Sequence, residues 1–125
     1  MMSAPDIGGV VCSVVTPFDE QYEIDYAAVH RILDFVIAGG VNCLMVGGTT
    51  GEGMLLSPEE RKTLCESVVG YVAGRVPALV HTGCINTLDT IKLAQHAESV
   101  GATAVSVIVP YFFAFDDDSL LANFM

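Results

Sequence analysis

The stretch that decides the fold spans residues 41–60 and reads VNCLMVGGTTGEGMLLSPEE. Residues 41–46 are mostly apolar and include β-branched side chains, which is typical of a buried strand. A glycine-rich segment follows at 47–53. Residues 57–60 (SPEE) then form a capping box with proline at the first helical position, which is a strong helix start. The order of strand, glycine-rich loop and helix predicts one β-loop-α unit.

The same unit recurs on both sides of this stretch. Apolar runs predict three further strands, at 7–16, 76–80 and 102–109. Three consecutive aspartates at 116–118, followed by two leucines at 120–121, are typical of the acidic first turn of a helix. The predicted order is therefore four strands that alternate with four helices, and the sequence stops inside the fourth helix.

The first three helices have recognisable ends. Asp25 and Thr87 can each cap a helix, and glycines at 39–40 and 101 can close one. The helical side chains expected to point inward are Tyr26, Val29, Leu33, Val36 and Ile37 in the first helix, Leu64, Val68 and Val72 in the second, and Leu88, Ile91, Ala94 and Ala97 in the third.

The predicted strands are continuously apolar instead of alternating. This pattern is typical of a parallel sheet that is covered on both faces. Two architectures fit it: an open doubly wound sheet, or a (β/α)8 barrel cut in half. A whole barrel takes about 250 residues, and this sequence has 125.

Composition excludes several classes of protein. Hydrophobic residues make up 52% and charged residues 16%, which excludes disorder. The net charge of −10 argues against nucleic acid or an anionic membrane surface as a partner. No run of 18 apolar residues is present, so we expect no membrane span. The first residues, MMSAPD, have no basic region, so we expect no secretory signal.

The four cysteines are Cys12, Cys43, Cys65 and Cys84. They form no C-x-x-C pair, and clustered cysteine and histidine spacing of the kind that binds metal is absent. We therefore expect reduced, buried thiols in a cytoplasmic protein, and no metal site.

Ligands of both candidate architectures gather beyond the carboxyl ends of the strands. Those ends carry TPF at 16–18, GGTTGEG at 47–53, HTG at 81–83 and PYFF at 110–113. In the second loop, four glycines allow close backbone approach and two threonines add hydroxyl donors, which suits a carboxylate or phosphate oxygen. It is not a P-loop, because no G-K-[ST] follows. The alternative is that this segment is only a turn.

The loop GGTTGEG, with TPF, TGCINT and VPYF after the other three strands, resembles the dihydrodipicolinate synthase / N-acetylneuraminate lyase family. The resemblance runs from about Gly8 to Met125. It implies pyruvate-utilising class I aldolase chemistry on a (β/α)8 barrel (the TIM barrel). It also implies that residues 1–125 are the N-terminal half of such a barrel, with about the first four βα units, ending inside the fourth helix.

The family chemistry implied by the resemblance needs a lysine that forms a Schiff base with pyruvate. It also needs a tyrosine in a Y-N-x-P element that assists proton transfer. In the family both lie beyond the fourth helix. Lys62 and Lys92 are the only lysines here, and both belong to predicted polar helices, so we interpret them as solvated surface residues. The catalytic lysine is then missing from this chain, and no cofactor is implied.

The resemblance assigns the substrate-binding loop. Thr50 and the amides around it, those of Gly48 and Gly51, would hold the pyruvate carboxylate. Thr49 would also bind the substrate and would be catalytic, relaying protons through tyrosine hydroxyls. The alternative is that both threonines only cap the next turn. Glu52 also matches the family motif, and we interpret it as a carboxylate that orders the loop.

The fourth strand departs from the synthase pattern. Synthases of the family end this strand with P-Y-Y, and the second tyrosine reaches a neighbouring subunit's active site. Phe112 replaces that tyrosine here and cannot pass a proton. Either Tyr111 takes over the proton transfer as a catalytic residue, or the proton relay contains one hydroxyl fewer. The segments HTGCINT and PYFFAF are nearer to the N-acetylneuraminate lyase branch, or to sugar-acid aldolases and dehydratases. His81 is expected to be a hydrogen-bonded rim residue.

Three hypotheses follow. The first is the N-terminal half of a Schiff-base lyase (aldolase) acting on pyruvate or another 2-oxo acid, partnered by a second half-barrel or assembled as a homo-oligomer. The second is a non-catalytic half-barrel that binds a small carboxylate or assembles as an oligomer through unpaired strand edges. The third is a complete doubly wound domain that binds phosphate at 47–53.

Overall fold

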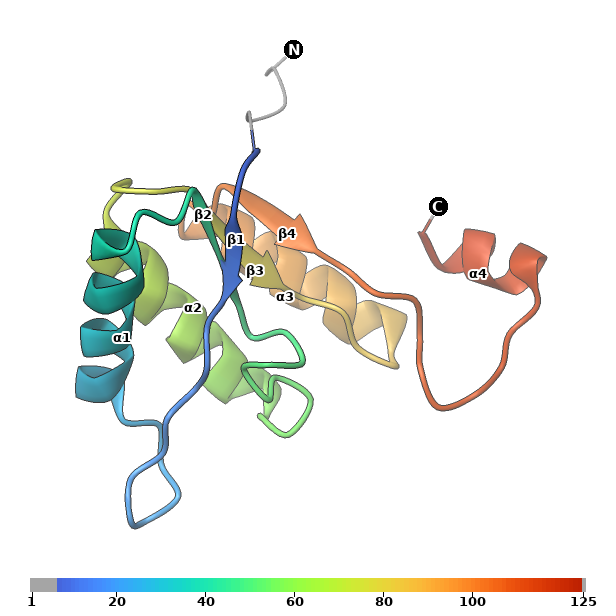
Figure 1. Ribbon diagram of the computed structural model, residues 1–125. Coiled ribbons are helices and arrows are strands. Elements are labelled where there is room, and N and C mark those ends of the chain that lie inside the picture. Colours follow the sequence, from blue (N-terminus) through green and yellow to red (C-terminus); the bar gives the residue numbers. More distant parts are fainter. Residues whose placement is uncertain (1–6, 125) are drawn as a thin grey trace.

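The computed structural model describes residues 7–124 and alternates strands with helices along the chain (Figure 1). The elements are β1 (Val11–Ser13), α1 (Tyr26–Ala38), β2 (Cys43–Val46), α2 (Pro58–Val72), β3 (Ala78–His81), α3 (Thr87–Ser99), β4 (Ala104–Ser106) and α4 (Asp117–Phe124). The predicted order of elements is confirmed.

The four strands form one parallel sheet in the order β1-β2-β3-β4. A doubly wound sheet needs a reversal of strand order and helices on both faces. The described residues show neither, because strand order follows chain order and α1, α2 and α3 lie on one face (Figure 1). The doubly wound alternative is therefore wrong for residues 7–124.

The core lies between the sheet and these helices. Its larger cluster packs Leu44 and Val46 of β2 against Leu33 of α1 and Val68 of α2. A smaller cluster joins α2, β3 and α3 through Cys65, Val80 and Ala97. All the strand residues in these clusters point to the same face of the sheet, as the strand register requires.

No helix of the described residues covers the opposite face of the sheet (Figure 1). Val11 and Ser13 of β1 are exposed, while Cys12 between them packs on the core. The prediction of a sheet covered on both faces is wrong for the described residues. The pattern of continuously apolar strands is also found in (β/α)8 barrels, where side chains from the strands fill the face that the helices leave uncovered. An apolar strand pattern does not distinguish cover by helices from cover by other strands.

The strands are shorter than predicted, most of all at the two edges. β1 and β4 each have a partner strand on one side only. Regular pairing in each edge strand therefore extends over only three residues. One further hydrogen bond follows β1, in which the Val14 N–H donates to the Met45 carbonyl at 2.9 Å.

The predicted ends of α1 and the predicted start of α2 are confirmed. The Asp25 carboxylate accepts from the Ala28 N–H at 2.9 Å and caps α1, which closes at Gly39. The capping box of α2 is complete: the Ser57 N–H donates to the Glu60 carboxylate at 2.7 Å, and the Ser57 hydroxyl accepts from the Glu60 N–H at 3.2 Å. Asp116 likewise accepts from the Ser119 N–H at 2.8 Å at the start of α4.

Helix α3 corrects two predictions. Its cap is Asn86, whose side chain accepts from the Leu88 N–H at 2.8 Å, and Thr87 is the first helical residue. Its buried residues are Leu93 and Ala97, whereas Leu88 and Ile91 are exposed. Ala97 is buried as predicted, but apolar residues extend around more of this helix than the sheet covers, so the pattern alone placed Leu88 and Ile91 inward wrongly.

Candidate functional site

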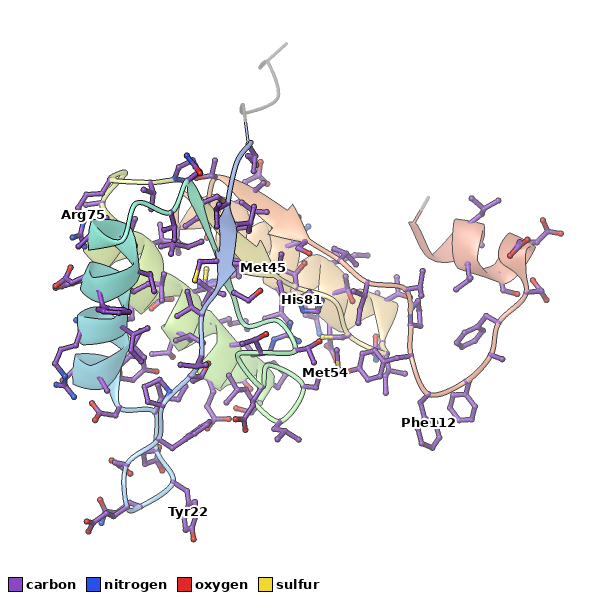
Figure 2. All side chains as sticks on the ribbon, viewed as in Figure 1. Tyr22, Met45, Met54, Arg75, His81 and Phe112 are labelled. Carbon is purple, nitrogen blue, oxygen red and sulfur yellow. The ribbon has the colours of Figure 1, made fainter. Side chains whose placement is uncertain are left out.

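Parallel pairing places the carboxyl ends of all four strands at one edge of the sheet. Figure 2 shows His81 at the end of β3 and Met54 on the loop after β2 at this same edge. Phe112 projects from the bend between β4 and α4, away from the body of the sheet. The edge is the candidate functional site.

The loop after β2 is too tightly packed for side chains at two of its glycines. A Cβ atom at Gly51 would lie 2.8 Å from the Val14 carbonyl oxygen. A Cβ atom at Gly53 would collide with the Gly47 carbonyl oxygen. Gly47 itself has a φ of +69°, in the left-handed region that favours glycine. These glycines let the loop fold back onto its own strand.

Backbone hydrogen bonds hold the loop in this shape. The Gly53 N–H donates to the Gly48 carbonyl at 3.1 Å, and the Glu52 N–H donates to the Thr49 carbonyl at 3.0 Å. Glu52 has a φ of +53° and orders the turn through its backbone, because its carbonyl also accepts from the Leu55 N–H at 2.9 Å.

Thr16, in the segment after β1, fixes the loop from the neighbouring part of the chain. Its hydroxyl is buried and donates to the Gly51 carbonyl at 2.7 Å. Sequence reasoning quoted Thr16 only as part of a motif and missed this role. The available signal was a hydroxyl residue placed at the end of an apolar run.

The predicted substrate-binding residues meet in this one turn. Gly48 and Gly51 are buried, whereas the side chains of Thr49 and Thr50 are exposed. Within residues 7–124, the N–H groups of Gly48, Thr50 and Gly51 donate no hydrogen bond. Buried N–H groups without partners are rare in proteins. The turn therefore offers unused donors beside two hydroxyls, which suits an anionic oxygen.

Tyr111 follows the buried Pro110 after β4 and is half-buried. The described residues show no hydrogen bond between Tyr111 and either Thr49 or Thr50, and β3 lies between their strands. Phe112 is exposed and has a φ of +84°, which is unusual for a residue with a side chain. The structure places these residues at one edge without joining them.

A buried arginine lies behind this edge, and sequence reasoning missed it. Arg61 of α2 is 8% exposed and donates to the His81 carbonyl at 2.7 Å and the Gly83 carbonyl at 3.1 Å. It also lies 3.3 Å from the His81 ring nitrogen Nδ1 and 3.0 Å from the Cys84 sulfur. The guanidinium thus ties α2 to the β3–α3 loop.

The available signal for Arg61 was its position. It lies four and seven residues before Cys65 and Val68, on the buried stripe of α2. His81 is hydrogen-bonded as predicted, but it is buried instead of lying on the rim. Burial lowers the pKa of His81, and the positive charge of Arg61 lowers it further.

The two lysines lie on helices α2 and α3, and each pairs with an acid of its own helix. Lys62 pairs with Glu59 at 3.9 Å on α2, and Lys92 pairs with Asp89 at 3.5 Å on α3. In each pair the acid comes three residues earlier on the same helix. This placement agrees with their interpretation as surface residues.

Residues 7–124 contain no group of three histidine, cysteine or acidic side chains that could hold a metal ion. Over the same residues, no helix combines the length and apolar character needed to span a membrane.

Comparison with known proteins shows which protein family this chain matches. The family model of the dihydrodipicolinate synthetase family matches residues 6–124. The chain is 37% identical over 119 residues to the 4-hydroxy-tetrahydrodipicolinate synthase of Bacillus subtilis (strain 168). It is 36% identical over 112 residues to the N-acetylneuraminate lyase of Escherichia fergusonii. These alignments cover 95% and 90% of this chain, but 41% and 38% of the relatives.

A solved structure also matches nearly the whole of this chain with less than half of its own length. A prophage protein of the dihydrodipicolinic acid synthase family from E. coli K12, in complex with pyruvate, superposes with a TM-score of 0.93 at 33% identity. The match covers 96% of this chain and 40% of that chain. The chain thus spans about two fifths of the length of the relatives that it matches. Since these relatives are (β/α)8 barrels, the predicted half-barrel is confirmed.

Proposed function

Because this chain belongs to the dihydrodipicolinate synthetase family, we propose that it is the carboxylate-binding half of a Schiff-base aldolase that acts on pyruvate or a related 2-oxo acid. One observation carries the proposal. The turn at 47–53 offers unused N–H donors and two exposed hydroxyls at the carboxyl edge of a half-barrel. The related E. coli protein solved with pyruvate supports the choice of ligand.

The proposed roles follow from the chemistry of the turn. The pyruvate carboxylate accepts hydrogen bonds from the Thr50 hydroxyl and from the N–H groups of Gly48 and Gly51. Such donors hold an anion without adding a charged side chain. The hydrogen bond from Thr16 keeps the turn rigid, so little entropy is lost when the ligand binds.

Proton transfer is assigned to Thr49 and Tyr111. Tyr111 carries the only phenol in the segment PYFF, because Phe112 has no hydroxyl. A hydroxyl relay needs groups that both donate and accept, and threonine and tyrosine both qualify. In a completed barrel, Tyr111→Phe should slow exchange of the pyruvate methyl protons by about 100-fold, while the carboxylate still binds. Proton NMR in deuterated buffer measures both properties.

The imine-forming lysine is proposed to come from a segment outside this chain. Lys62 and Lys92 each pair with an acid on the outer helices. An imine-forming amine must be neutral when it attacks the ketone, which favours a desolvated site. The proposed partner is therefore a second half-barrel in a cytoplasmic protein, and the assembled barrel is expected to form homo-oligomers.

The first test concerns binding by this chain alone. Titration with pyruvate should shift the amide resonances of Gly48, Thr50 and Gly51. Thr50→Val should weaken these shifts, and the control Thr63→Val on the exposed face of α2 should leave them unchanged. If pyruvate moves none of the loop resonances, the proposed binding role is wrong.

The second test concerns chemistry. The part of the Bacillus subtilis synthase that this chain does not match is co-expressed with it, and the complex is treated with pyruvate and borohydride. Reduction traps an imine as a stable mass increase on a lysine of the added half. Trapping that depends on both halves supports the aldolase proposal.

A non-catalytic half-barrel is the second candidate. The observation that favours it is Phe112, which removes a hydroxyl from the strand-four segment. This candidate predicts that pyruvate shifts the loop resonances, yet no imine is trapped after the second half is added and the barrel has closed.

A further inference from the structure

The four thiols of this chain have different surroundings. Cys43 and Cys65 are buried. Burial raises the pKa of the Cys43 thiol. Burial, followed by the negative charge of Glu66, raises the pKa of Cys65 to about 11. These two thiols stay protonated and shielded, so they are poor nucleophiles.

Cys12 and Cys84 are both partly exposed, so access alone does not distinguish them. The Cys12 sulfur contacts the Ser13 carbonyl at 3.9 Å. The Cys84 sulfur lies 3.0 Å from Arg61 Nη1. A thiol reacts as its anion, and a neighbouring cation stabilises that anion. Only Cys84 has such a contact among the described residues.

The surroundings of Arg61 are an independent reason to expect an anion here. Its side chain is buried, yet no carboxylate pairs with it within residues 7–124, and its Nε has no hydrogen-bond partner. A buried charge without a counter-ion is costly. Among the groups that contact the guanidinium, only the Cys84 sulfur can become negative by losing a proton.

We propose that Cys84 is the nucleophilic thiol of this chain and the site at which a hydroperoxide oxidises it to a sulfenic acid. The sulfur reacts beside the Arg61 guanidinium, 3.0 Å from Nη1, and the thiol proton passes to solvent as the sulfur attacks. The sulfur attacks the terminal oxygen of the hydroperoxide, so that an S–O bond forms as the O–O bond breaks. Sulfur is oxidised by two electrons, and the departing alkoxide (hydroxide when the oxidant is hydrogen peroxide) takes up a proton to give an alcohol (or water).

A short pulse of iodoacetamide tests the nucleophile. After digestion, mass spectrometry gives the rate of alkylation at each cysteine in the folded chain and in denaturant. In the folded chain, Cys84 should react at least about tenfold faster than Cys12. Cys43 and Cys65 should be protected. In denaturant all four rates should converge. A Cys12 rate equal to that of Cys84 in the folded chain would overturn the proposal.

Variants test the role of Arg61. Arg61→Gln should lower the Cys84 rate about tenfold, and Arg61→Lys should retain part of it because the charge remains. The control Arg75→Gln removes an arginine that pairs with Asp34 on the outer helices and should leave the rate unchanged. Protection of Cys43 and Cys65 shows that a variant is folded. If Arg61→Gln is unfolded, the wild-type ratio of Cys84 to Cys12 decides.

The oxidation step has its own readout. Hydrogen peroxide followed by dimedone should place the adduct on Cys84, and Cys84→Ser should abolish most of the labelling. A dimedone adduct spread evenly over Cys12 and Cys84 would contradict the assignment.

Discussion

At the scale of single residues, close packing explains why glycine occupies the turn after β2. Gly53 lies so close to the Gly47 carbonyl that a methyl group has no space. Gly70 of α2 is the opposite case, since a Cβ atom there meets nothing within 4 Å. The two positions carry the same residue for different reasons, and one of them is free to change.

Gly53→Ala should therefore destabilise the chain by about 1–3 kcal/mol, because the loop must move to relieve the overlap. Gly70→Ala should stabilise it by up to about 1 kcal/mol, because alanine is the better helix former. Urea denaturation of the two variants measures both changes. A Gly53→Ala variant as stable as the unmodified chain would show that packing around Gly53 does not set the shape of the loop.

At the scale of elements, Arg61 and His81 join α2 to the β3–α3 loop. His81 is buried, and its pKa is lowered by burial and then by Arg61. The unfolded chain therefore binds a proton near the ordinary value of 6.5 while the folded chain stays neutral. The contribution of His81 to stability is complete above pH 6.5 and is lost as the pH falls from that value toward its lowered pKa.

We expect the free energy of unfolding to fall between pH 7 and pH 5, and His81→Asn should flatten this part of the profile. Urea denaturation at a series of pH values measures the slope. An unchanged slope in the variant would mean that other groups cause the pH dependence.

The helices also show how far local sequence can predict elements. Asp25 and the box at Ser57 were predictable because a cap needs only a side chain and the next three residues. The inward stripe of α3 was not, because which apolar residues are covered depends on the neighbouring elements. The same limit applies to Arg61, whose partners lie 20 or more residues away in the sequence.

At the scale of the whole molecule, the alternation of strands and helices and the parallel pairing were predictable from the sequence pattern, but the strand order was not. Alternating elements force parallel pairing, and parallel pairing collects the loops at one edge. The geometry of the loop at 47–53 could not be predicted from the sequence. The hydrogen bond from Thr16 to Gly51 joins residues 35 positions apart, and no local pattern reports it. The choice between barrel and open sheet came from motif resemblance, since hydrophobic periodicity fits both.

The half-barrel leaves apolar strand edges without partners. β1 and β4 each pair on one side only within residues 7–124, and Val11 and Val105 on these strands are exposed. Such edges favour association with another chain. The net charge of −10 opposes it, and this repulsion reaches about 30 Å at 0.01 M salt but only about 3 Å at 1 M.

The chain alone should therefore associate more strongly as salt concentration rises, which is opposite to the behaviour of a complex held by ion pairs. Sedimentation velocity at low and high salt measures this. Val11→Lys combined with Val105→Lys should reduce association at high salt, because charged residues block edge pairing. Phe35→Lys combined with Leu88→Lys is the matched control with the same added charge, since Phe35 on α1 and Leu88 on α3 are exposed apolar helical residues. If the control reduces association as much as the edge variant, general surface hydrophobicity and not the open strands drives the contact.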